Sequence, residues 1–152
     1  MFADTLTRVS WRTRPRSFVA LMALYESNFI RLGWLAGDLE RLAGTHRSHV
    51  EGDCDLLLSV TERSAYTSFV RLTYLMPTAH GPMRCPDMQL RIYHDARLVE
   101  AAGWASGQGT CAPKVSLGLA ERELDQRWAR NMMLNKWLEY CAERGHRFSA
   151  ST

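Results

Sequence analysis

The chain has 152 residues, of which 46% are hydrophobic and 23% charged, so it is long enough for one domain that needs neither a metal nor a disulfide for its stability. Its formal charge of +3 arises within residues 1–16, which carry four arginines against one aspartate, while the remaining chain is neutral. A neutral body argues against extended binding to nucleic acid, which needs many phosphate contacts.

Two helices are predicted, one near each end of the chain. Residues 1–15 show no stable period, and we expect them to form a flexible basic arm. From Ser17, a plausible N-cap, apolar residues recur at three- and four-residue steps, with a break near Gly37 and an end by Leu42. The second helix runs from about Ala120 to Arg144 and stops at Gly145.

The segments between the helices read as strands. Alternating residues predict strands at 54–60 and 66–76, joined as a hairpin, then at 88–93 and 97–102, with a short fifth strand at 114–119. Residues 77–86, rich in proline, and the Gly-rich residues 104–113 are expected to be loops. The predicted class is α+β: an antiparallel sheet of four to five strands flanked by an N-terminal and a long C-terminal helix. The domain would span residues 16–147, with 148–152 as a tail.

The cysteines and the hydropathy pattern bear on the compartment. Cys54, Cys85, Cys111 and Cys141 form no Cys-x-x-Cys pair, and we expect no signal peptide before them, because the N-terminal residues show no signal-peptide pattern. The apolar stretch from residue 18 to residue 35 is interrupted by polar and charged residues, so it is not a membrane span. We therefore expect reduced thiols, a cytoplasmic protein and no membrane partner.

Several short blocks of sequence, taken together, indicate a family resemblance. They are Tyr25-Glu26-x-Asn28-Phe29, Glu62 with Tyr66-Thr67, Met88-x-x-Arg91-x-Tyr93-His94-Asp95-Ala96, and Asn131 with Trp137-Leu138-x-Tyr140-Cys141. In these blocks the chain resembles the YqiB-like family of small bacterial proteins, a domain of unknown function. The resemblance implies an α+β cytoplasmic protein and supplies no activity.

Residues 91–97 hold the densest set of reactive side chains. His94 could serve as a general base, with Asp95 and Glu62 as the other weak catalytic candidates. Adjacent strand residues point to opposite faces, however, so His94 and Asp95 converge only if the chain turns between them. In a turn, Asp95 would more naturally bond backbone amides. The sequence does not decide whether the protein is an enzyme, and on balance it favours a protein without catalytic activity.

The same region contains candidate ligands for an anion. Arginine and tyrosine side chains could surround a phosphate or carboxylate; these are Arg63, Tyr66, Arg91, Tyr93 and Arg97. The alternative is a set of surface ion pairs with Glu62, Asp95 and Glu100. No metal is expected, because His46-x-x-His49 lacks a third ligand. No cofactor is expected either, because the glycines of residues 103–109 match no phosphate-binding loop.

The last helix has more large apolar residues than one narrow stripe requires. Trp128, Met133, Trp137 and Tyr140 predict either a deeply buried helix or an interface, which could be that of a homodimer. We therefore expect a non-catalytic binding or adaptor domain that engages a protein or a small anionic ligand near the sheet hairpins. The alternative is a small hydrolase of a phosphorylated or nucleotide-like compound, with His94 as its base.

Overall fold

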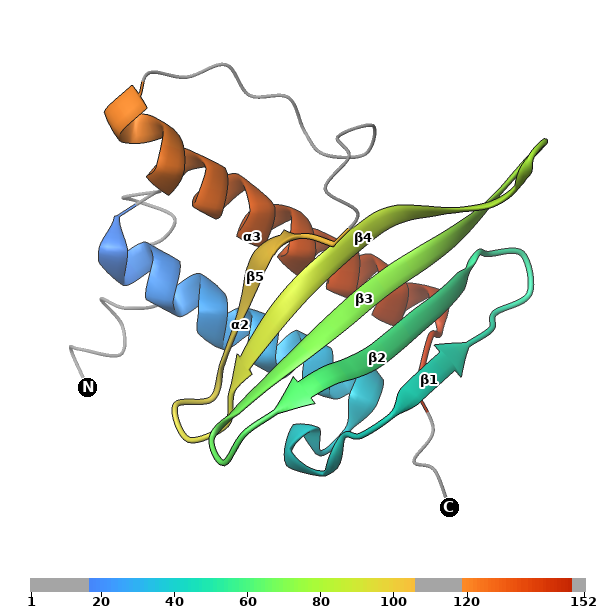
Figure 1. The fold of residues 1–152 in the computed structure, drawn as a ribbon, viewed down its shortest axis with the longest axis horizontal. Coiled ribbons are helices and arrows are strands. Elements are labelled where there is room, and N and C mark those ends of the chain that lie inside the picture. The colour runs from blue at the N-terminus through green and yellow to red at the C-terminus, as the bar shows by residue number, and fades with distance from the viewer. Residues whose placement is uncertain (1–16, 106–118, 149–152) are drawn as a thin grey trace.

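The computed structural model describes residues 17–105 and 119–148. Its elements are α2 (Phe18–Ala36), η1 (Leu39–Arg41), β1 (Thr45–Ser48), β2 (Asp55–Arg63), β3 (Thr67–Thr78), β4 (Gly81–Tyr93), β5 (Leu98–Trp104) and α3 (Leu119–Arg144). The strands form one antiparallel sheet in the order β1-β2-β3-β4-β5, and α2 and α3 lie side by side on one face of it (Figure 1). The predicted α+β class is confirmed. The predicted arm and nearly all of the strand predicted at 114–119 fall outside the described residues.

Helix α2 begins and ends where local chemistry dictates. The Ser17 side chain accepts a hydrogen bond from the Ala20 amide, 3.1 Å away, which confirms the predicted N-cap. Gly37 ends the helix with a φ of 72°, a left-handed conformation that suits glycine, and its amide bonds to the Gly33 carbonyl. The short η1 follows, so the predicted break near Gly37 is correct.

The hairpin of β3 and β4 corrects the loop predicted at residues 77–86. The two strands pair from Thr67 with Tyr93 to Thr78 with Gly81, and Pro77 lies opposite Pro82. Beyond the reach of β2 and β5, no other strand of the described residues pairs with this ribbon. A proline there removes no hydrogen bond from the sheet, which is why the strands continue through it.

Strand β1 was also missed from the sequence. Thr45 to Ser48 pair with β2 between Ser59 and Leu56, in a segment for which the sequence predicts no strand. These four residues are polar and show no alternation of hydrophobicity, so the strand pattern was absent. These residues form a strand because the adjacent edge of β2 has backbone amides and carbonyls with which they can pair.

The core lies between the sheet and the two helices. Alternate residues of the strands face the helices and are fully buried, including Leu56, Leu58, Leu72 and Leu90. Burying one such side chain stabilises the fold by about 1.5–3 kcal/mol. Phe148, which follows the predicted domain limit, is 5% exposed and belongs to the same core cluster.

Among the described residues β5 is an edge strand, and polar side chains of the helices bond to its outer side. Asn28 of α2 donates to the Val99 carbonyl at 3.1 Å, and Asn131 of α3 accepts from the Ala101 amide at 2.7 Å. The Asn28 amide also donates to Asn131 and accepts from Asn135, so the asparagines form one buried network. An exposed edge strand invites pairing with other chains, and this capping prevents it.

The cysteines differ from the expectation of reduced thiols. Cys54 and Cys141 are free, whereas Cys85 is disulfide-bonded. Burial raises the pKa of the Cys141 thiol to about 12, so that thiol stays protonated and acts as core filler. In the described part of the chain, no helix is long and apolar enough to span a membrane.

Candidate functional site

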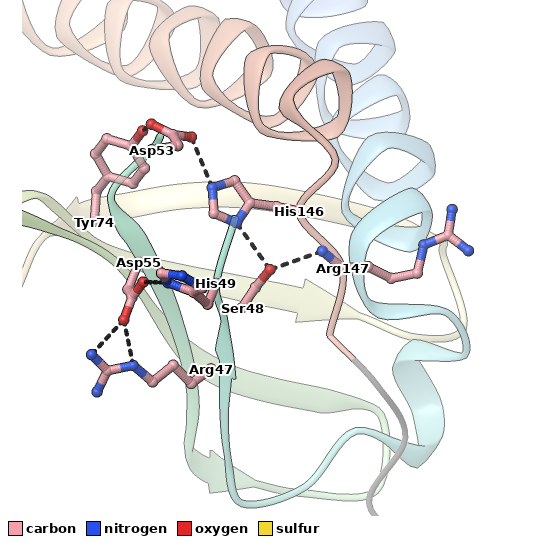
Figure 2. A network of polar contacts seen from close by, with 8 residues as sticks. All are labelled: Arg47, Ser48, His49, Asp53, Asp55, Tyr74, His146 and Arg147. Carbon is pink, nitrogen blue, oxygen red and sulfur yellow. Dashed lines mark hydrogen bonds and ion pairs between the residues drawn. The ribbon is translucent and has the colours of Figure 1, made fainter. Parts of the chain in front are cut away.

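A buried polar network joins the region of β1 and the start of β2 to the residues that follow α3 (Figure 2). Ser48 ends β1, Asp53 lies in the loop before β2, and His146 follows the end of α3. His146 Nδ1 lies 2.9 Å from Ser48 Oγ, and His146 Nε2 lies 2.9 Å from an oxygen of Asp53. The imidazole is fully buried. Two parts of the chain that are more than 90 residues apart in sequence therefore meet on one histidine.

Asp53 is a buried carboxylate whose charge is well compensated. It accepts hydrogen bonds from the Tyr74 hydroxyl and from His146, and the Arg144 guanidinium lies 3.8 Å away. Burial by itself would raise the pKa of Asp53. The bonds from Tyr74, the Cys54 amide and His146 outweigh that effect and hold the pKa below its usual range.

A second carboxylate nearby holds a separate polar group, as Figure 2 shows. Asp55 at the start of β2 lies 2.6 Å from His49 Nδ1 and accepts from Arg47 Nε at 2.7 Å. The bonds from His49 and Arg47 lower the pKa of Asp55. His49 and Arg47 are exposed, so this outer group contributes less than the buried one.

The order serine, histidine, aspartate invites comparison with a nucleophilic triad. Ser48 is only 4% exposed, and its Oγ already accepts the backbone N–H of Arg147 at 2.9 Å. A nucleophile must reach a substrate carbonyl, and this hydroxyl is enclosed by its own chain. The arrangement is a structural network of three connected groups. No pattern in the sequence indicates this network, because a serine, an aspartate and a histidine at such spacings occur in most chains.

A cavity of about 760 Å³ lies close to this network. The end of α2, η1, the start of β1 and the residues after α3 line it: Gly33, Trp34, Leu35, Ala36, Gly37, Asp38, Arg41, Leu42, Ala43, His46, Arg147 and Phe148. None of these residues was singled out as an anion or aromatic ligand from the sequence. His46 was considered only as a metal ligand, and no group of metal-binding side chains occurs among the described residues.

The three weak catalytic candidates do not form a hydrogen-bonded group. Residues 94–97 make a tight turn between β4 and β5, so the chain does turn after Tyr93. His94 is 7% exposed and lies 2.7 Å from Ser68 Oγ, while its Nδ1 is buried without a hydrogen-bond partner. Burial, followed by the charge of Arg63, lowers the pKa of His94. Asp95 and Glu62 are exposed.

The structure divides the five candidate anion ligands. Arg91 and Tyr93 both bond to Glu100 on β5, at 3.1 and 2.8 Å, and the Arg91 guanidinium lies over the Phe69 ring. The alternative of an ion pair with Glu100 therefore holds for Arg91.

The other three candidate anion ligands lie apart from that pair. Arg63 donates to the Leu42 carbonyl at 3.1 Å. Tyr66 and Arg97 are exposed in the turns at the same end of the sheet, and Arg97 has a φ of 57°.

The predicted interface residues of α3 differ in burial. Trp137 is 7% exposed and packs edge-on against Tyr74, with ring centroids 6.2 Å apart, so it is a core residue. Trp128 and Met133 are half-buried, and Tyr140 is 46% exposed. Of the two alternatives for this helix, deep burial describes Trp137, and only Tyr140 is well exposed.

Fold and site define a small α+β protein with one sheet, two covering helices, and a buried network next to a cavity. The chain belongs to the family described as "Protein of unknown function (DUF1249)", whose model matches residues 31–147. It is 29% identical over 131 residues to "Uncharacterized protein YqiB" of Escherichia coli strain K12, covering 84% of this chain and 90% of that protein. Proteins of the same name from Escherichia coli O6:H1 and O157:H7 match equally well. No solved structure gives a significant match. The resemblance inferred from the short blocks is thus confirmed.

Proposed function

We propose that this protein is a non-catalytic binding protein for a small ligand that combines an anionic group with a flat apolar body. The observation that carries the proposal is the cavity of about 760 Å³ between α2, η1 and residues 147–148. Its volume falls within the range of small-molecule sites, which are mostly apolar with a few polar groups that orient the ligand.

The charges lining the cavity favour an anion. Arg41 and Arg147 contribute two guanidinium groups, while Asp38 is the one carboxylate of the lining. Asp38 and Arg41 form only a loose, exposed pair at 3.5 Å. Figure 2 shows the Arg147 guanidinium pointing away from the buried network, where it is free to meet a ligand. Guanidinium groups bind carboxylates and phosphates through paired hydrogen bonds.

The rest of the lining favours an apolar or aromatic body. Trp34 is 52% exposed on α2, although it is one of the largest apolar side chains of the protein. Phe148 also belongs to the lining and contacts His46 edge-on, with ring centroids 6.5 Å apart. Large rings in the lining of a concave site supply apolar contact for a ligand.

The turns at the end of the sheet remain a second location for an anion. Arg91 would have to give up Glu100 to bind there, so this location has weaker support. The hydrolase alternative also has weak support, because His94 is buried against Ser68 and neither Asp95 nor Glu62 bonds to it. We retain a cytoplasmic location as a proposal, to be tested by cell fractionation and by the redox state of Cys85.

Calorimetric titration with phenyl phosphate and benzoate tests the proposal, with inorganic phosphate and benzyl alcohol as half-ligands. We expect saturable binding of an aromatic anion, weakened about tenfold in Arg147→Gln and in Trp34→Ala. Arg84→Gln and Tyr140→Ala alter an exposed arginine and an exposed tyrosine away from the cavity, and should bind normally. Absence of binding by both aromatic anions, or equal losses in the control variants, would overturn the proposal.

A further inference from the structure

The chain changes direction at the end of α3, and residues 147–148 then line the cavity. Gly145 has a φ of 95°, and its amide bonds to the Ala142 carbonyl while the His146 amide bonds to the Cys141 carbonyl. This pairing of backbone bonds closes the helix and redirects the chain. Residues 146–148 therefore leave the helix in a defined direction.

Each of these three residues is then fixed to a different part of the fold. The His146 side chain is held between Ser48 and Asp53. The Arg147 amide donates to Ser48 Oγ at 2.9 Å, and the Phe148 amide donates to the Leu35 carbonyl of α2 at 2.7 Å. The segment is thus tied to β1, to the loop before β2 and to α2.

The hydrogen bonds have a consistent direction. Because Ser48 Oγ accepts the Arg147 N–H, its own hydroxyl hydrogen can donate to His146 Nδ1. The imidazole then carries its hydrogen on Nε2 and donates it to Asp53, which also accepts from Tyr74. Every donor in this series of hydrogen bonds has an acceptor, so the network is rigid and its hydrogen-bonding groups are paired.

From this geometry we propose that Ser48, His146 and Asp53 are positioning residues for the cavity. They hold the backbone of residues 146–148 so that the Arg147 side chain and the Phe148 ring form one of its walls. The network contacts the backbone of Arg147 and leaves its guanidinium outside, as Figure 2 shows. The consequence for binding rests on the proposed function, whereas the fixing of the segment is independent of it.

Amide hydrogen exchange in the absence of ligand tests the fixing. In Ser48→Ala we expect exchange of the Arg147 and Phe148 amides to accelerate about tenfold or more, while core amides such as Leu72 change little. Asp53→Asn is a second variant that leaves Ser48 in place, and because it also lowers the global stability, its exchange at Phe148 should rise by a larger factor than its exchange at Leu72. His49→Gln, which alters an exposed histidine bonded to Asp55, is the matched control. Unchanged exchange at Phe148 in both network variants overturns the proposal.

Titration of the same variants with phenyl phosphate tests the consequence for binding. We expect affinity to fall about tenfold in Ser48→Ala, although its side chain is not part of the cavity lining. Faster exchange at Phe148 with unchanged affinity would refute the link between network and cavity. If the wild type binds neither aromatic anion, the proposed function fails, while the exchange experiment still decides whether the network fixes the segment.

Discussion

His146 and Ser48 are 98 residues apart in sequence, yet Nδ1 of one lies 2.9 Å from Oγ of the other inside the fold. This contact joins the shortest strand of the sheet to the segment after the last helix. Strand β1 has only four residues and pairs only with β2 among the described strands. The hydrogen bond from Ser48 to His146 therefore helps to hold β1 in place. The network and the cavity therefore depend on the same few contacts.

Replacing Asp53 by asparagine should make the protein less stable and less sensitive to acid. We expect the free energy of unfolding at pH 7 to fall by about 1–3 kcal/mol, because Tyr74 and His146 lose their charged acceptor. The pKa of Asp53 is lowered in the folded state, so below about pH 4 the unfolded chain binds a proton that the folded chain does not. That part of the stability is present above pH 4 and is lost as the pH falls through the lower folded value.

Urea denaturation at several pH values between 7 and 3 measures this effect. Asp53→Asn should lose less stability on acidification than the wild type. Glu51→Gln, an exposed change in the same loop, should follow the wild type. A variant curve parallel to that of the wild type would contradict the assignment.

Replacing Asn131 by alanine should expose the edge of β5. The Ala101 amide and the Asn28 side chain both lose an acceptor, and each donor left unsatisfied costs about 1–3 kcal/mol. Urea denaturation gives the loss of stability, and hydrogen exchange of the Ala101 amide gives its location. Lys136→Ala, an exposed change on the same helix, is the control. Slow exchange of the Ala101 amide in the variant would show that the edge is protected in another way.

Acidification should destabilise the protein through His94 as well. Burial and the charge of Arg63 lower the pKa of His94 in the folded state, whereas the unfolded value is about 6.5. As the pH falls below about 6.5, the unfolded chain takes up a proton first, so the stability decreases. His94→Asn should remove this component between pH 7 and pH 5.5, measured by urea denaturation. His80→Asn, at the exposed turn of β3 and β4, should retain it; loss of the component in both variants would rule out His94 as its source.

Deleting residues 1–15 should leave the melting temperature nearly unchanged. The sequence places four arginines within residues 1–16 but no periodic apolar pattern before Ser17, so this segment is expected to lie outside the domain. Thermal unfolding of the shortened and full-length chains measures the difference. A large drop would mean that the arm is part of the fold.

Local patterns in the sequence were sufficient for most of the secondary structure. Ser17 and Gly37 mark the limits of α2 because capping depends on neighbouring residues only. Apolar residues fall at every second position in Cys54, Leu56, Leu58 and Val60, and this period of two is enough to predict β2 and its buried face. Strand β1 and the proline-rich part of β3 and β4 lacked such patterns, since their order comes from the strands beside them.

The sequence by itself determined the fold class, the order of the helices and the family. Helix periods, strand periods and short motifs each involve residues that are close together in the sequence, so they can be recognised without the tertiary structure. Only the tertiary structure decided that His146 lies between Ser48 and Asp53, and that Trp34 and Phe148 face one cavity. Such contacts depend on the path of the whole chain. No spacing in the sequence encodes them, since the residues concerned are brought together only when the helices pack on the sheet.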